Sequence, residues 1–158
     1  MKVSGIDPET GSSHEYDATD VNDEFIESMS DFEMSDDKVK RLIDNLNVSA
    51  DVKSLLYEFS KITIKAGEFV LKVGRKILDF ICKLMDEYPS VTFGMVFGAI
   101  VGFLIASIPI LGVVIGPVFT PIAIAFGLLS GLQEDLKDKN LAREIEKINA
   151  SFSPLDAA

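Results

Sequence analysis

The sequence predicts an all-α fold, in which a membrane-embedded helical hairpin is preceded by a long amphipathic helix and by a disordered acidic N-terminal tail. Three observations predict this fold. The chain is uncharged between Glu87 and Glu134, apolar residues recur at helical spacing before that segment, and acidic residues crowd the first 37 positions. The expected regions are a largely disordered tail over 1–35, amphipathic cytosolic helices over 36–88, the hydrophobic hairpin over 89–132, and a cytosolic helix and tail over 133–158.

The N-terminal region has too much charge of one sign to favour a folded core. Residues 1–37 hold twelve Asp or Glu side chains against the single cation Lys2. Such a composition buries too little apolar surface to offset the entropy of ordering, so we expect disorder up to about Thr19. The following segment, with Phe25 and Met29 in helical spacing, would fold on a basic protein partner or on the chain's own basic helix. The alternative is a tail that only solubilises the chain.

Two helices are expected in the second region. A short helix from Asp36 to Asn47, capped by Ser35, is expected first. A long amphipathic helix follows from about Ser49 to Glu87, with Ser49 as the cap at its start and Pro89 ending it. The long helix holds seven basic and three acidic residues between Lys53 and Lys83. A basic helix with an apolar stripe lies on an anionic lipid surface or packs in a helical bundle, and both interpretations stay open. The candidate membrane-surface residues are Lys72, Arg75, Lys76 and Lys83.

The uncharged segment is too long for a single membrane span. Its 46 residues would make about 69 Å of helix, against a hydrocarbon core of about 30 Å. A first arm from Val91 to Ile108 would be followed by a second arm that spans the bilayer or, if it restarts at Pro121, only enters it. The alternative, a hairpin buried inside a folded protein, is opposed by the small number of amphipathic segments that would cover it. The residues of the expected turn are Pro109, Gly112, Gly116, Pro117 and Pro121.

Small residues recur every fourth position in both arms. Because residues four apart share one helix face, each arm has a face on which another helix backbone can approach closely. The spacing predicts helix association, either between the two arms or between the subunits of a homo-oligomer. The candidate association residues are Gly94, Gly98, Gly102, Ala106, Ala123, Gly127 and Gly131.

The repeat of Gly94, Gly98 and Gly102 resembles the glycine-zipper motif of membrane-embedded helices. An uncharged hairpin after amphipathic helices is similar to the hydrophobic hairpin of colicin-type pore-forming domains. It also resembles the bilobed hydrophobic segment of bacterial inclusion-membrane proteins. The likeness covers Val91 to Leu132 and is architectural, so no functional residue carries over from these families.

The sequence contains little material for catalysis. His14 is the only histidine and has no cysteine or second histidine near it, so we expect no metal site, no cofactor and no enzymatic activity. No Gly-Lys-Ser or Gly-Lys-Thr follows the glycines, and a pI near 4.5 argues against nucleic acid as a partner. Cys82, the single cysteine, fits a reducing compartment as a structural thiol, and palmitoylation is the alternative.

The functional prediction is a hairpin-anchored, multi-pass membrane protein that self-associates through its small-residue faces and presents cytosolic helices and an acidic tail to protein partners. Both termini are expected in the cytosol, because basic residues flank the hairpin on both sides and none lies at its tip. Two alternatives are a pore-forming or membrane-permeabilising effector with a colicin-like hairpin, and a secreted effector inserted into a host membrane. The expected partners are a lipid bilayer, further copies of the chain and a protein that binds the acidic tail.

Overall fold

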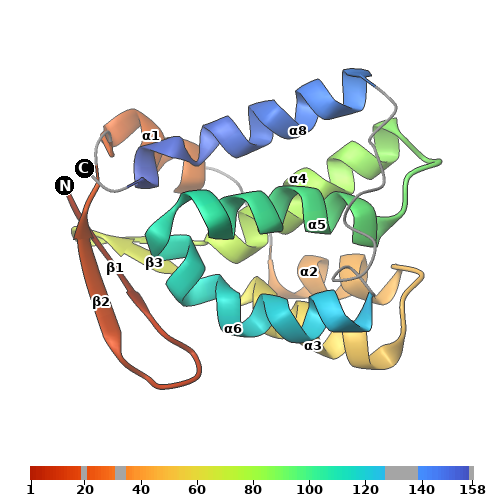
Figure 1. The fold of residues 1–158 in the computed structure, drawn as a ribbon, viewed down its shortest axis with the longest axis horizontal. Coiled ribbons are helices and arrows are strands. Elements are labelled where there is room, and N and C mark those ends of the chain that lie inside the picture. The colour runs from red at the N-terminus through yellow and green to blue at the C-terminus, as the bar shows by residue number, and fades with distance from the viewer. Residues whose placement is uncertain (19–20, 31–34, 127–138, 157–158) are drawn as a thin grey trace.

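The computed structural model describes residues 1–18, 21–30, 35–126 and 139–156 and shows a mixed α/β fold (Figure 1). The all-α prediction is therefore wrong, because a four-stranded antiparallel sheet lies beside the helices. The elements are β1 (Lys2–Ile6), β2 (Ser13–Asp17), α1 (Asp23–Ser30), α2 (Asp36–Asp44), α3 (Ala50–Ser60), β3 (Ile64–Ala66), β4 (Phe69–Leu71), α4 (Val73–Glu87), α5 (Phe93–Ser107), α6 (Pro109–Ala125), α8 (Lys139–Ser151) and a 3-10 turn, η1 (Ser153–Leu155).

The N-terminal segment, expected to be disordered, forms the β1–β2 hairpin. Val3 pairs with Tyr16 across the hairpin and is fully buried, whereas the acidic residues of β2 point outward. The connecting loop is held by the Asp7 carboxylate, which accepts a hydrogen bond of 2.8 Å from the Glu9 N–H. The prediction of disorder was wrong because mean composition averages the two faces of a strand, whereas only the inward face must be apolar.

The long amphipathic helix expected from Ser49 to Glu87 is interrupted. Helix α3 ends at Ser60, and a β3–β4 hairpin separates it from α4. Gly67 sits in the tight turn of that hairpin with a φ of +60°, a conformation that suits glycine. Strand β3 pairs with β1, which gives the sheet order β2-β1-β3-β4. The apolar spacing was misread because β-branched residues around Ile64 fit a strand as well as a helix.

The apolar hairpin of α5 and α6 lies in the core of the fold rather than in a bilayer. Helix α5 packs against α4 and α8, while α6 packs against α3 and β1. The Phe97 ring is fully buried, with ring centroids 5.3 Å from Phe59 of α3 and 5.7 Å from Phe119 of α6. A helix that is apolar on all sides needs cover on most of them, and the sheet and the two halves of the expected long helix supply it.

None of the helices in the described part of the chain combines the length and the apolar character that a bilayer crossing requires. Helix α5 has 15 residues and α6 has 17, against the roughly 20 that a span needs. The predicted membrane-embedded hairpin, the anchoring function and the multi-pass localisation are therefore contradicted. The pore-forming and host-membrane alternatives required the same membrane-embedded hairpin and are contradicted by the same finding.

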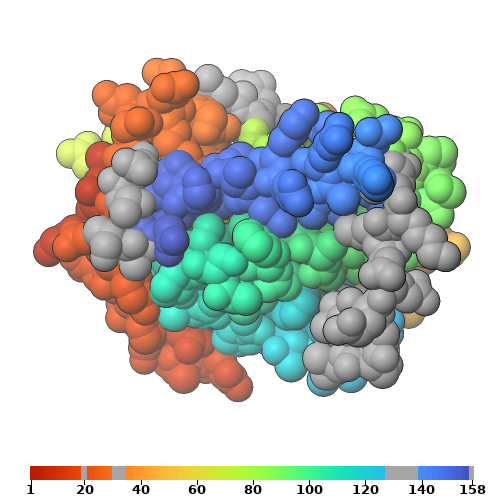
Figure 2. Space-filling model, turned by 45° about the horizontal axis from the view of Figure 1, so that its top comes forward, coloured from red at the N-terminus to blue at the C-terminus, as the bar shows by residue number. Residues whose placement is uncertain are grey.

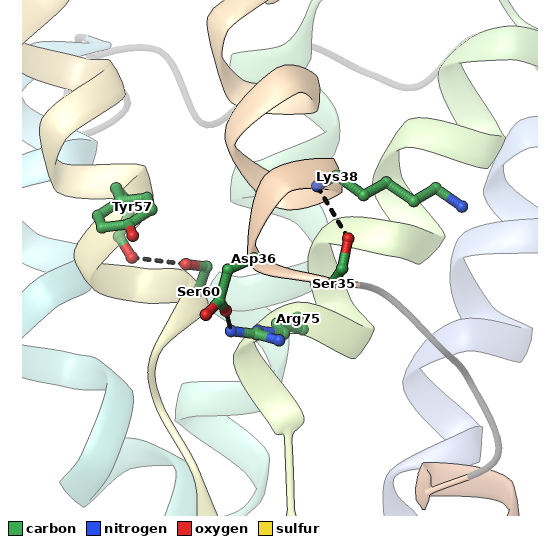
Figure 3. Close-up of polar contacts among 6 residues, drawn as sticks. All are labelled: Ser35, Asp36, Lys38, Tyr57, Ser60 and Arg75. Carbon is green, nitrogen blue, oxygen red and sulfur yellow. Dashed lines mark hydrogen bonds and ion pairs between the residues drawn. The ribbon is translucent and has the colours of Figure 1, made fainter.

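Polar contacts hold α2 against the junction between α3 and α4 (Figure 3). Ser35 caps α2, as predicted, by accepting a hydrogen bond of 3.2 Å from the Lys38 N–H. The neighbouring Asp36 carboxylate accepts a hydrogen bond from the Arg75 guanidinium at the start of α4. At the end of α3, the Ser60 hydroxyl donates to the Tyr57 carbonyl at 2.6 Å. Of these contacts, the Arg75–Asp36 pair joins α4 to α2, and the other two lie within α2 and within α3.

Helix α8 closes the fold on the side of α5 (Figure 1). Its apolar side chains Leu141, Ile145 and Ile148 are buried. Phe152, just beyond the helix, is fully buried and meets the Phe80 ring of α4 edge-on at 6.0 Å between centroids. The C-terminal segment is thereby part of the core.

Candidate functional site

A groove of about 460 Å³ opens between the β1–β2 hairpin, the end of α3 and the middle of α6. Three segments that are distant in the sequence meet there, because β1 pairs with β3 directly after α3 and also packs on α6 (Figure 1). We call it the hairpin groove. Its lining residues are Ser4, Gly5, Ile6, Pro8 and Ser13 from the hairpin, Glu58, Lys61, Ile62, Thr63 and Lys65 from the α3–β3 segment, and Val114 and Val118 from α6.

Gly5 sets how closely the hairpin approaches α6. A Cβ atom at this position would lie 2.3 Å from Cγ1 of Val114 and 3.3 Å from Cδ1 of Ile110. Any side chain would therefore push the strand away from the helix and reshape the wall of the groove. The glycine is needed here for close approach of strand and helix.

The floor of the hairpin groove is apolar. Val114 is buried, Ile62 and Val118 are half-buried, and Ile6 is exposed at the mouth. The remaining lining is polar, since six of the twelve lining residues carry a polar or charged side chain. The volume lies within the usual range of roughly 300–1,000 Å³ for small-molecule sites.

The rim of the groove carries two ammonium groups and one carboxylate. Lys61 lies 3.8 Å from the Glu58 carboxylate and 4.6 Å from the centre of the Tyr57 ring. Lys65, on the outer face of β3, is exposed, and its ammonium group makes no ion pair or hydrogen bond with any described residue. Thr63, which lies between these two lysines in the sequence, also lines the groove. The rim therefore has a net positive charge within a chain whose net charge is −10.

The sequence prediction missed this site. It placed Lys61 and Lys65 within a continuous amphipathic helix and treated the hairpin strands as disordered, so no groove was expected. A signal was present in the run from Ile62 to Ile64, where β-branched residues dominate, and in Gly67 just after it. The pairing of this segment with residues 2–6 had no counterpart in any local pattern.

The expected helix-association residues are divided by the fold. Gly94 and Gly98 are buried, and a Cβ atom at Gly94 would lie 3.0 Å from the Phe126 ring. Gly102 is half-buried and Ala106 is exposed, so the second half of the α5 stripe faces outward. Ala123 of α6 is buried, whereas Gly127 and Gly131 lie outside the described residues.

The residues of the expected turn are spread along α6. Pro109 is the first residue of that helix, and the turn itself is confined to Ile108. A Cβ atom at Gly112 would lie 3.1 Å from the Ile105 carbonyl oxygen, so this glycine permits close contact with α5. Gly116, Pro117 and Pro121 lie inside α6.

The four candidate membrane-surface cations do not form a stripe of unpartnered charge. Arg75 binds Asp36, the Lys83 ammonium lies 2.9 Å from the Asp79 carboxylate, and the Lys76 ammonium lies 5.1 Å from the centre of the Phe80 ring. Lys72 is exposed at the start of α4. Three of the four therefore have a partner, Arg75 on α2 and the two lysines within α4 itself.

The described residues offer little for acid–base or metal chemistry. No group of three or more His, Cys, Asp or Glu side chains within them is arranged to hold a metal ion. His14 lies in β2, where it pairs with Gly5 of β1, and Cys82 lies in α4, on the side that faces α2. Burial, reinforced by the charges of Asp79 and Asp86, raises the pKa of the Cys82 thiol to about 11, which opposes thiolate formation.

Comparison with models of protein families, with curated proteins and with solved structures finds no match to this chain. The assignment of a function therefore depends on the chemistry of the hairpin groove and of the surface.

Proposed function

We propose that this chain is a non-catalytic binding protein and that its ligand is a small anionic molecule with an apolar body, held in the hairpin groove. The observation that carries the proposal is the combination in one groove of an apolar floor with the Lys65 ammonium group, which has no ion-pair or hydrogen-bond partner among the described residues. Val114 and Val118 would cover the apolar body, and Lys65 would face the anionic group.

The charge of the rim supports an anion over a cation. The whole chain has a net charge of −10, yet the groove sets Lys61 and Lys65 against the single carboxylate of Glu58. An anion would be repelled by most of the surface and attracted at this rim, which gives the site selectivity.

The expected contribution of the ammonium group is modest because Lys65 is exposed. An exposed ion pair contributes about 0.5–1 kcal/mol, which is roughly a twofold to fivefold change in affinity. Most of the binding free energy would come from apolar contact with the floor. Substitution of the lysine should therefore change selectivity more than total affinity.

The test uses two fluorescent probes that differ only in charge, 1-anilinonaphthalene-8-sulfonate and the neutral N-phenyl-1-naphthylamine. We expect Lys65→Gln to weaken binding of the sulfonate about twofold to fivefold and to leave the neutral probe unchanged. Val118→Phe, which fills the floor of the groove, should weaken the binding of both probes. Lys40→Gln, at an exposed lysine on α2, is the matched control and should change neither.

The proposal fails if the unsubstituted chain binds neither probe, or if Val118→Phe leaves both affinities unchanged. It also fails in its charge assignment if Lys65→Gln and Lys40→Gln have the same effect. Circular dichroism of each variant, run alongside, shows that the fold is retained.

A further inference from the structure

The surface of α5 and α6 that faces away from the hairpin groove carries no charge. No Asp, Glu, Lys, Arg or His occurs from Phe93 to Phe126, whereas every other described α-helix has charged side chains. Figure 2 shows α5 and α6 as a continuous strip of surface beside α8. This strip includes two of the most exposed large apolar side chains, Phe103 at 52% and Ile124 at 60%.

The exposed residues of the two helices lie on the same side of the hairpin. The helices run antiparallel, and a Cβ atom on Gly102 would lie 4.0 Å from the Phe119 ring. With this register, the helical repeat brings the outward residues of each helix to one face. We call this face the uncharged face, and its six central residues are Gly102, Phe103, Ala106, Gly116, Thr120 and Ile124.

The uncharged face has little unsatisfied polarity. Thr120 is the only one of its six residues with a polar side chain, and its hydroxyl donates a hydrogen bond of 3.1 Å to the Gly116 carbonyl oxygen. The donor of that hydroxyl is therefore used within α6. Contact with another protein surface would cost little desolvation of polar groups and would remove Phe103 and Ile124 from water.

We infer that the uncharged face is the contact between two copies of this chain, arranged about a two-fold axis. Two chains of net charge −10 repel each other, so their contact is favoured on a face without charge. The shape of the face also leaves room for a second copy. Phe103 protrudes beside Gly102, and a Cβ atom on Gly116 would have no atom within 4 Å, so the Phe103 rings of two copies have room to lie side by side across the axis.

The size of the face sets the expected strength of the contact. Helix α5, with 15 residues, is about 22 Å long, and two adjacent helices are about 20 Å wide, which gives a footprint of about 450 Å² per copy. Two copies would bury about 900 Å² together, which is below the roughly 1,200–2,000 Å² of stable specific interfaces, so the dimer should be weak and concentration-dependent. The inference is independent of ligand binding in the hairpin groove, which opens elsewhere on the molecule.

The test is sedimentation velocity of the full chain over about two decades of concentration. We expect the unsubstituted chain to shift from monomer toward dimer, and we expect Phe103→Glu and Phe103→Lys each to remain monomeric because like charges would meet across the two-fold axis. An equimolar mixture of the two variants should dimerise, since opposite charges then face each other. Val70→Glu, at an apolar residue of β4 that is 48% exposed, is the matched control and should still dimerise.

A monomer at the highest concentration of the unsubstituted chain would overturn the inference, as would equal loss of the dimer in Val70→Glu and Phe103→Glu. A mixture no more associated than either variant alone would exclude the two-fold arrangement with adjacent Phe103 side chains. Because Phe103 is half exposed, each variant should keep the thermal transition of the parent chain, which excludes unfolding as the cause.

Discussion

Substitution of Gly74 by alanine tests the separation of α3 from α4. Gly74 is the second residue of α4, and its N–H donates a hydrogen bond of 3.1 Å to the Ile62 carbonyl. A Cβ atom on Gly74 would lie 2.1 Å from the Phe59 carbonyl oxygen, where ordinary contacts start at about 3.4 Å. The end of α3 or the start of α4 must therefore move by roughly 1.3 Å to accept one methyl group.

The expected magnitude follows from two opposing terms. Alanine is favoured over glycine in a helix by about 0.5–1 kcal/mol, whereas a clash with a packed backbone costs about 1–3 kcal/mol. We therefore expect Gly74→Ala to lower the free energy of unfolding by about 1–2 kcal/mol. For a domain of this size the melting temperature should fall by roughly 2–8 °C.

Gly102→Ala is the matched control for this experiment. Its Cβ atom would meet only the Phe119 ring, at an ordinary 4.0 Å, so the helix term should dominate and raise stability by about 0.5–1 kcal/mol. Urea denaturation of both variants measures whether each substitution raises or lowers the free energy of unfolding. Equal stabilisation by both substitutions would refute the reasoning, because Gly74 would then lie inside one continuous helix from Ser49 to Glu87.

Three further predictions concern single side chains. The pKa of about 11 keeps the Cys82 thiol protonated, so its alkylation by iodoacetamide at pH 8 should be on the order of a hundredfold slower in the folded chain than in urea. The free energy of unfolding should also fall as the pH rises from about 9 to about 11, because the thiol of the unfolded chain loses its proton first. Ser49→Ala removes the hydroxyl that accepts from the Val52 N–H at 3.3 Å and should cost about 1 kcal/mol in urea denaturation, whereas the exposed Ser54→Ala should cost nothing. Phe152→Ala empties a fully buried site and should lower the free energy of unfolding by about 3–5 kcal/mol, and a loss below about 1 kcal/mol would show that the C-terminal segment is not in the core.

Local signals in the sequence predicted local structure well. Ser35 and Ser49 were predicted as helix caps and are confirmed, because a serine hydroxyl before an acidic first turn satisfies an N–H group whatever the rest of the fold does. The end of the amphipathic region before Pro89 is also confirmed, since α4 ends at Glu87. These signals involve residues within four positions of each other.

The remaining features depend on contacts that are distant in the sequence. Val3 is buried because β1 pairs with β3, some 60 residues later, and no window around Val3 contains that information. The environment of the α5–α6 hairpin was mispredicted for the same reason. The sheet is one of the elements that cover this hairpin, and its strands were not predicted. The hairpin groove needs all three distant segments and so was not predicted at all.

The central claim is that the acidic N-terminal segment contains a strand that packs on α6 and forms one wall of the hairpin groove. Hydrogen exchange of residues 2–6 tests this claim most directly. β1 is paired on one side with β2 and on the other with β3, so its amides should exchange at least about a hundredfold more slowly than an unstructured peptide of the same sequence. Exchange at the unstructured rate throughout Lys2–Ile6, with Gly5 unprotected, would contradict the account and remove the groove together with the sheet.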